Sequence, residues 1–488
     1  MASANDKHWS YRGEGNRSLV VANSLERRVY RLSKVNPWLK SDTEADEVRS
    51  LMIHRELQMS VDYIREVIQP LLSARIVPLP VLSIITRGVA LDAEKNVQHV
   101  RPAHRKGQAV LSQSVDPAAC SALVLPDLCF VASPHGPGQQ SLLHSHPTVS
   151  VEIKPKKAFI PSPLSIEHEN SVKCEVCKFC LHQRLKAKEG QWPRRSRYCP
   201  LELFSGDRVR MKHALLGLVE TPQNNLKICL NGEEIYGAVK KEDLSLVLDS
   251  FSSHVPTNGL TNGLKKQRQL HAILDLVIDV LLSVSKDDPD ISTSLKSNHS
   301  GVNFPQQSCR NSNFKLTDKL VKMSNLPRGC VLERVLSAQR LDELDIDGVV
   351  PLYEKLELHL KEHPEDREKW CLDGPYTGDL WLSPCLASSS QAETESLQTT
   401  LNQVKRFLIS KTVQDCSIMV AIQKVQDRLS EDSYDYIVDE HGQAYHYSVS
   451  IIDLDPKPFD KIPSYRQQEA KILKAYKEAT ENGDKCCL

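Results

Sequence analysis

The segment that most restricts the fold of this chain is residues 149–154, where apolar and polar side chains alternate strictly. A period of two is typical of a β-strand with one buried face. Pro155 follows, and because it offers no backbone N–H it ends the strand. The alternation places Glu152 and Lys154 on one face, so the strand carries two opposite charges to its end.

Two further apolar segments, 418–422 and 445–451, are expected to be strands, and each has an aspartate beside it. Asp415 precedes the first, and Asp453 follows the second. Strand ends that present carboxylates beside lysines suit phosphoryl transfer, because aspartate holds the metal ion while lysine or arginine holds the phosphates. A solvated turn after an edge strand would give the same pattern. The residue composition of the segment alone favours such a turn over a phosphoryl-transfer site.

Residues 11–34 predict a strand, a glycine turn and two more strands. A turn of this kind can lay backbone amides over nucleotide phosphates, although a plain β-turn has the same sequence pattern. A long helix is expected over 44–72, packed on this sheet. Its apolar positions, mostly at helical spacing, are Val48, Leu51, Met52, Leu57, Ile64, Val67 and Ile68.

Other segments complete the expected organisation. Residues 123–128 predict a buried strand that runs into a connector, and 208–220 and 395–410 predict helices. The longest apolar stretch, 270–284, is interrupted by acidic residues and is too short for a bilayer, so it predicts a buried or amphipathic helix. Residues 285–313 are rich in Ser, Asn, Asp and Gly and predict a disordered insert.

Composition narrows the class of protein. The chain has 488 residues, enough for two or three packed units, and 62 basic against 62 acidic side chains. This balance argues against direct nucleic-acid binding through bulk positive charge, so any anion site must be local. The polar N-terminus lacks a signal peptide, and we expect a cytoplasmic or nuclear monomer without a membrane span.

A cluster of cysteine and histidine has the ligand types and spacing of a structural zinc site. The preferred ligands are His168, Cys177, Cys180 and His182, with Cys174 as the substitute. A helix start with buried cysteines is the alternative. Bound zinc would fix the segment that delivers Lys186.

Nine segments in order carry a resemblance to a known family. They are YRGEGN (11–16), RPAHR (101–105), EIKPK (152–156), HQRLK (182–186), YCPLELFSG (198–206), QNN (223–225), LDELDIDG (341–348), DCSIM (415–419) and DLDPKP (453–458). Over nearly the whole chain they resemble the inositol-pentakisphosphate 2-kinase family. The resemblance implies an α+β fold of two lobes, distantly protein-kinase-like, with residues 1–127 as a small N-terminal lobe and 128–488 as a large C-terminal lobe.

The same resemblance implies transfer of the ATP γ-phosphate to the 2-hydroxyl of inositol 1,3,4,5,6-pentakisphosphate, giving the hexakisphosphate. Asp453 would hold Mg²⁺, Lys154 would meet the transferring phosphate, and Asp415 would position the attacking hydroxyl or accept its proton. The expected ATP contacts are Gly13, Gly15, Asn16, Arg31, Asp127 and Glu152. No His-Arg-Asp or Asp-Phe-Gly motif occurs, so a protein kinase has little support.

The inositol phosphates would lie among Arg105, Lys156, Lys186, Asn224, Asn225, Lys457, Lys461 and Tyr465. Each substrate phosphate needs a cationic or amide donor to replace lost water, and these residues supply such donors from distant segments. Two alternatives remain open. One is a non-catalytic, zinc-stabilised scaffold that binds inositol phosphates; the other is a kinase for another inositol phosphate or a lipid head group.

Overall fold

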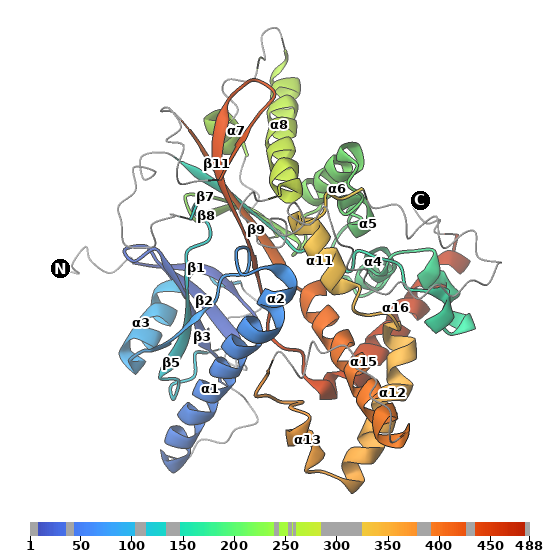
Figure 1. The fold of residues 1–488 in the computed structure, drawn as a ribbon. Coiled ribbons are helices and arrows are strands. Elements are labelled where there is room, and N and C mark those ends of the chain that lie inside the picture. The colour runs from blue at the N-terminus through green and yellow to red at the C-terminus, as the bar shows by residue number, and fades with distance from the viewer. Residues whose placement is uncertain are drawn as a thin grey trace, which may run out of the picture.

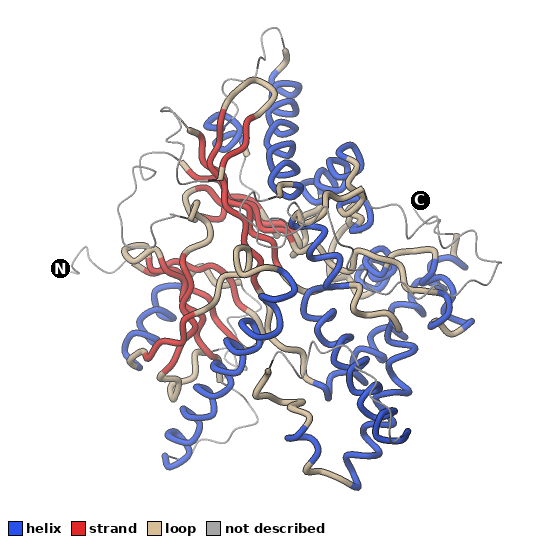
Figure 2. The backbone as a smooth tube through the Cα atoms, viewed as in Figure 1, coloured by secondary structure: helices blue, strands red, loops and turns tan. Residues whose placement is uncertain are grey.

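The computed structural model of the chain contains two antiparallel sheets and a large set of helices (Figure 1). The residues it describes are 8–35, 43–102, 114–132, 147–238, 244–251, 256, 260–284, 325–377, 392–425 and 435–483. Arg105 and the insert expected at 285–313 lie outside the described residues. Figure 2 shows the strands gathered on one side and most helices on the other.

The N-terminal sheet has five strands in the order β1-β2-β3-β5-β4. Its strands are β1 (Trp9–Glu14), β2 (Ser18–Asn23), β3 (Arg28–Ser33), β4 (Val81–Ile84) and β5 (Ser121–Pro126). The strand, turn and two strands predicted over 11–34 are therefore confirmed, as is the strand leading to the connector. Neither Gly13 nor Gly15 has a positive φ, so this turn does not depend on the left-handed backbone that glycine allows.

Two helices cover opposite faces of the N-terminal sheet (Figure 1). Adjacent residues of β5 show the division, since Ala122 packs with the core under α3 (Arg87–Val97) and Leu123 packs with Leu57 of α1 (Thr43–Tyr63). The predicted long helix is confirmed, continuing from α1 through a π-helical turn, Ile64–Ile68, and α2 (Gln69–Leu72).

The packing assigned to the first turns of that helix was wrong. Val48, Leu51 and Met52 are exposed, whereas Leu57, Ile64, Val67 and Ile68 are buried. The apolar spacing is continuous, but α1 extends past the edge of the sheet at its N-terminal end (Figure 1). Only its later turns therefore find strands to pack against.

The central sheet has six strands in the order β10-β11-β9-β6-β7-β8. Its strands are β6 (Thr148–Ile153), β7 (Leu226–Leu230), β8 (Glu233–Tyr236), β9 (Ser417–Lys424), β10 (Tyr436–Val438) and β11 (Ala444–Ile452). All three strands predicted at 149–154, 418–422 and 445–451 are confirmed. The alternation in β6 works as expected, because Val149, Val151 and Ile153 all join the largest hydrophobic core.

Helices cover the core face of the central sheet and continue beyond its end (Figure 1). They are α4 (Lys178–Lys188), α5 (Pro200–Leu203), α6 (Arg208–Glu220), α7 (Ser245–Phe251), α8 (Asn262–Leu282), α11 (Val331–Gln339), α12 (Asp345–Glu362), α13 (Asp366–Lys369), α15 (Ala392–Gln414) and α16 (Ile462–Glu481). The predicted helices at 208–220, 270–284 and 395–410 are confirmed. The fold class is α+β. None of the helices in the described part of the chain has both the length and the hydropathy needed to cross a membrane.

Candidate active site

Strand register gathers the charged residues at one end of the central sheet. Ile153 of β6 pairs with both Ile418 of β9 and Leu226 of β7, and Ile418 pairs with Ile451 of β11. Because neighbouring strands are antiparallel, the end of β6 lies beside the starts of β7 and β9 and the end of β11. The segments that carry Lys154, Asn225, Asp415 and Asp453 therefore meet there. We call this region the charged sheet end.

Lys154 and Asp453 form an ion pair at the charged sheet end. The Lys154 Nζ lies 2.8 Å from Asp453 Oδ2. Ser417 Oγ is 3.0 Å from the same oxygen and 2.8 Å from Glu152 Oε1, and its single proton can serve one carboxylate at a time. Desolvation alone would raise the pKa of Asp453, but Lys154, Ser417 and Arg31 lower it below its usual range. Asp453 is thus kept ionised, as a metal ligand must be.

Asp415 is held by two lysines from different segments. Lys457 donates a hydrogen bond of 3.0 Å to Asp415 Oδ2, and Lys156 Nζ lies 3.9 Å from Oδ1. Desolvation would raise the pKa of Asp415, yet Lys457 and Lys156 together lower it. Its side chain keeps 56% exposure, so it can reach a ligand.

A bidentate ion pair connects the two sheets at this site. Arg31 on β3 donates to both carboxylate oxygens of Asp455, at 2.7 and 2.5 Å, although 424 residues separate the two in sequence. The fork of the guanidinium suits a bidentate acceptor, whether carboxylate or phosphate. Asp455 was not among the predicted site residues, although it lies two positions after Asp453.

The glycine turn has an anchored base and an open tip. Glu14 accepts hydrogen bonds from Lys34 and Arg101, and all three side chains are almost fully buried. A Cβ added at Gly15 would meet no atom within 4 Å, so the space beside it is open. Asn16, next in the turn, is exposed. A buried ionic base holds the turn while its tip stays accessible.

Lys227 is a candidate site residue that the sequence interpretation missed. It lies opposite Glu152 in the ladder, with Nζ 3.5 Å from the Glu152 carboxylate, and it donates a 2.8 Å hydrogen bond to the Arg12 carbonyl of β1. A Cβ on Gly13 would lie 3.9 Å from this Nζ, so the ammonium is near the glycine turn. The available signal was a single lysine within an otherwise apolar strand, LKICL.

The carboxylate of Asp127 is already occupied. Arg12 donates to it at 2.6 Å, and the backbone N–H of Cys129 donates at 3.1 Å. The residue lies at the end of β5, as expected for the connector, but its side chain is buried. Through Arg12, the Asp127 side chain therefore holds the connector against β1.

Two of the lysines predicted to bind the inositol phosphates, Lys156 and Lys186, have lowered pKa values. Desolvation and the charge of Lys154 lower the pKa of Lys156, against the opposing effect of Asp415. Desolvation and Lys156 lower the pKa of Lys186 to about 8. Lysines whose charges repel one another form a local positive region that a polyphosphate would neutralise.

The remaining predicted residues around this region differ in exposure. Asn224 and Lys461 are exposed, and Tyr465 is half-buried with Asp415 close enough to raise the pKa of its hydroxyl further after desolvation. Asn225 is buried, and its carbonyl accepts the backbone N–H of Lys154 at 2.9 Å. Its side-chain amide has no hydrogen-bond partner among the described residues.

Two site residues have backbones in the left-handed region. Lys156 has φ +63° and Asp453 has φ +63°. Residues other than glycine pay about 1 kcal/mol or more for this conformation, and such strain concentrates at functional sites. The surrounding contacts must therefore hold both residues in place.

The structure groups three cysteines but does not bring the two expected histidine ligands to them. Cys177, Cys180 and Cys199 bring their sulfurs within 4.8 Å of one another, while neither His168 nor His182 belongs to this group. Residues two apart on a helix point to different sides, so Cys180 and His182 of α4 cannot face the same centre. His168 is exposed in a 3-10 turn, His168–Cys174.

His182 and Cys174 both lie apart from the sulfur cluster. Desolvation, then Lys186 and Lys178, lower the pKa of His182 to about 4, so its ring is neutral at physiological pH. Cys174, the proposed substitute ligand, is also outside the sulfur cluster. Hydrogen bonds from Cys177 and Cys180 lower the pKa of Cys199, which favours a thiolate in the cluster.

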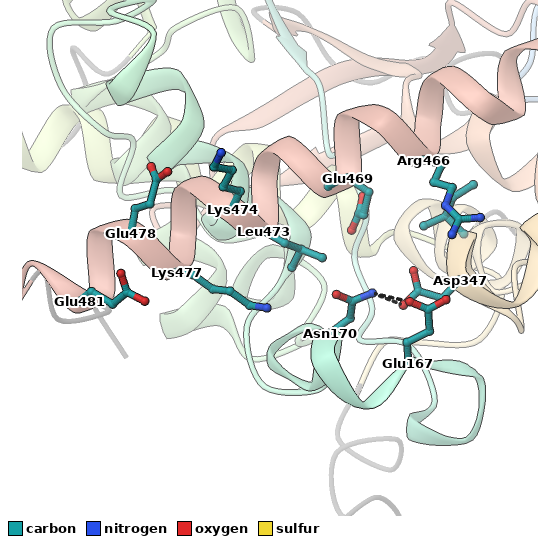
Figure 3. Close-up of a pocket in the computed structure, with 12 residues that line it drawn as sticks. Glu167, Asn170, Asp347, Arg466, Glu469, Leu473, Lys474, Lys477, Glu478 and Glu481 are labelled. Carbon is teal, nitrogen blue, oxygen red and sulfur yellow. Dashed lines mark hydrogen bonds between the residues drawn. The ribbon is translucent and has the colours of Figure 1, made fainter.

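A separate cavity of about 510 Å³ lies beside α16 (Figure 3). Its walls mix opposite charges, including Glu167, Asp347, Arg466 and Lys477, and Asn170 donates to Asp347 at 2.9 Å. None of the predicted site residues lines it. The charged sheet end is therefore the stronger candidate for catalysis.

This combination of paired carboxylates, lysines and an accessible glycine turn has the chemical groups of a phosphotransferase. The family model described as inositol-pentakisphosphate 2-kinase matches residues 11–471. The chain belongs to the inositol-pentakisphosphate 2-kinase family. It is 32% identical over 481 residues to the inositol-pentakisphosphate 2-kinase of Danio rerio, covering 98% of this chain and 94% of the relative. It is 29% identical to the enzyme of that name from Arabidopsis thaliana, covering 97% of this chain and 94% of the relative.

Proposed function

We propose that this protein transfers the γ-phosphate of ATP to the 2-hydroxyl of inositol 1,3,4,5,6-pentakisphosphate, producing inositol hexakisphosphate. The observation that carries the proposal is the position of Asp415. It lies against Lys156 and Lys457, and the Lys154–Asp453 pair occupies the same sheet end. A carboxylate between two groups of phosphate-binding cations suits a hydroxyl that attacks a phosphate.

We divide the molecule into two lobes on this basis, with residues 1–127 supplying the nucleotide-side turn and 128–488 supplying the rest. On the nucleotide side we place Gly13, Gly15, Asn16 and Arg31, with Glu152 toward the nucleoside and Lys227 as an added cation. Asp127 would act through the connector, because its carboxylate is paired with Arg12.

Asp453 fits a magnesium ligand. It offers an ionised carboxylate at 50% exposure, and the carboxylate group of Asp455, which Arg31 contacts, lies two residues later. Hard divalent cations prefer such oxygen ligands. Bound Mg²⁺ would neutralise charge on the ATP phosphates.

The chain's own residues supply the remaining chemistry. Lys154 and Arg31 would exchange their carboxylate partners for phosphate oxygens when the nucleotide binds. Asp415 would accept a hydrogen bond from the attacking hydroxyl and orient it. Its lowered pKa makes it a weak base in the free protein, but phosphates that engage Lys156 and Lys457 would reduce their effect and raise its pKa. A loose transition state needs little proton removal before attack, so orientation is its main contribution.

The substrate pocket would use Lys156, Lys186, Asn224, Lys457, Lys461 and Tyr465, together with Asn225 through its contact with Lys154. Arg105 remains a proposal from the family resemblance.

Incubation with Mg-ATP and inositol pentakisphosphate should yield hexakisphosphate, detected by anion-exchange chromatography. Binding of both ligands without product would favour the scaffold, and faster turnover of a less phosphorylated inositol would favour the alternative kinase.

The affinity for inositol pentakisphosphate should fall as pH rises above about 8. Lys186 has its pKa lowered to about 8, so the free protein loses this charge above that pH, whereas the phosphates bind the charged form. Binding then requires proton uptake, and we expect Kd to rise about tenfold per pH unit between about pH 8 and 10. Calorimetric titration from pH 7 to 9.5 measures this change.

The matched variant for this experiment is Lys186→Arg, which stays charged throughout the range. It should bind with a flatter pH profile than the wild type. Any substrate phosphate that loses a proton in this range gains negative charge, which strengthens its attraction to the lysines, so its titration cannot produce the expected weakening. Equal slopes for the two proteins would exclude Lys186 as the source.

We also propose structural zinc at the sulfur cluster of Cys177, Cys180 and Cys199. Thiolate ligands at this separation suit zinc, and the cluster packs near α4, which carries Lys186. Purified protein should contain about one zinc per chain, and Cys199→Ser should lose the metal and about 3 kcal/mol of unfolding free energy. Elemental analysis and denaturant unfolding measure the two effects. Cys371→Ser, at a buried cysteine outside the cluster, should keep its zinc. A metal-free wild type would remove the assignment.

A further inference from the structure

The backbone that follows β6 is irregular, and its polar groups are satisfied by distant residues. The N–H of Lys154 donates to the Asn225 carbonyl at 2.9 Å, and the Tyr198 hydroxyl donates to the Pro155 carbonyl at 2.8 Å. A buried backbone outside a sheet ladder needs such partners. The next residues, Lys156 and Ala158, receive theirs from one side chain.

That side chain is Gln339, the last residue of α11, which is completely buried. Its Nε2 donates to the Lys156 carbonyl at 2.9 Å, and its Oε1 accepts from the Ala158 N–H at 2.9 Å. These two partners determine the amide orientation, because the reversed amide would place donor against donor and acceptor against acceptor. Gln339 thus replaces a missing neighbouring strand for two backbone groups.

Gln339 also contacts the helix that leads to Asp415. The Ser410 hydroxyl of α15 donates to the Gln339 carbonyl, and Gln414 Nε2 donates to the Ser410 hydroxyl at 2.9 Å. Asp415 directly follows α15. One buried residue therefore connects the backbone of Lys156 to the helix end that presents Asp415, whose carboxylate lies 3.9 Å from the Lys156 ammonium.

We propose that Gln339 is a positioning residue for inositol-phosphate binding. It holds Lys156 in the left-handed backbone conformation that directs its ammonium toward Asp415, and thereby sets where a substrate phosphate meets the lysine. The inference rests on the proposed function of Lys156. Without the two hydrogen bonds, φ +63° is unfavourable for lysine, and the backbone would relax away from it.

The test is a double-mutant cycle between Gln339→Met and Lys156→Met. Methionine keeps the length and apolar volume of glutamine but makes neither hydrogen bond. Gln339→Met should raise the KM for inositol pentakisphosphate about tenfold and leave the KM for ATP within about twofold. In a Lys156→Met background the same change should have almost no further effect, because the group it positions is gone.

Gln269→Met is the control, since this residue is a buried glutamine on α8, outside the candidate site. It should leave both KM values unchanged. If Gln339→Met does not fold, Gln339→Asn keeps the amide but is one methylene shorter, so it cannot reach both the Lys156 carbonyl and the Ala158 N–H, and it should show the same selective rise. A purely structural role would instead lower the unfolding midpoint with equal effects in both backgrounds, which would overturn the inference.

The outcomes also separate this inference from the function on which it depends. A raised KM in Lys156→Met with a normal KM in Gln339→Met would overturn the role of Gln339 alone. Unchanged KM values in Lys156→Met would overturn the substrate assignment of Lys156 and the inference with it. Absence of hexakisphosphate from the wild-type protein would overturn the proposed reaction itself.

Discussion

Asp415→Asn should lower kcat by about 10³-fold while inositol pentakisphosphate still binds. Asparagine keeps the shape of aspartate but cannot accept the hydroxyl proton, and it presents an N–H₂ group where the hydroxyl needs an acceptor. Lys156 and Lys457 would also lose their carboxylate partner, which leaves them more available to phosphates. Steady-state kinetics and calorimetric binding together separate the two effects.

A matched control lies at the other end of the central sheet. Glu440→Gln makes the same acid-to-amide change in the turn before β11, at a side chain with 80% exposure. Its kcat should stay within about twofold of the wild type, as expected for a surface change away from the site. Retained turnover in Asp415→Asn would show that Asp415 neither orients nor deprotonates the hydroxyl.

Asp453→Asn should reduce kcat/KM for Mg-ATP by about 10³-fold, because a neutral amide is a poor magnesium ligand. The same change removes the partner of Lys154, so nucleotide without metal should bind at least as well as to the wild type. These opposite effects distinguish loss of the metal from general damage. Turnover over a range of magnesium concentrations and metal-free nucleotide binding provide the measurements.

The scaffold alternative makes a different prediction for the same variant. A protein that only binds inositol phosphates has no turnover to lose. Asp453→Asn could then change only its ligand affinity and its stability. If Asp453→Asn kept its dependence on magnesium and its turnover, Asp453 could not be the metal ligand. Asp455, two residues away and paired with Arg31, would then be the next candidate.

Elements with a strong local period could be predicted from the sequence. Residues 149–154 and 445–451 alternate because one face of each strand packs in the core, and both strands were found. The early turns of α1 show the limit of this approach. Val48 and Leu51 have helical spacing but are exposed, because periodicity indicates a face without showing what lies opposite it.

Residues that act through distant partners were harder to find. Cys199 lies 19 positions after Cys180, and the shorter spacing to His182 favoured the histidine over this cysteine, which the structure places beside Cys177 and Cys180. Lys227 resembled an ordinary strand residue until the ladder placed it opposite Glu152. Gln339 had no signal, since a glutamine at the end of a helix is common and its partners are backbone groups 181 and 183 positions away.

The sequence alone determined the strand that carries Glu152, its end just before Pro155 with Lys154 beside it, and the two aspartates beside other strands, because these depend on local periodicity and on residue chemistry. The tertiary structure decided which charges meet. Pairing of Lys154 with Asp453, and of Asp415 with Lys457, follows from antiparallel register and loop paths. Register depends on the summed packing of the whole sheet and its covering helices, so no short segment contains that information.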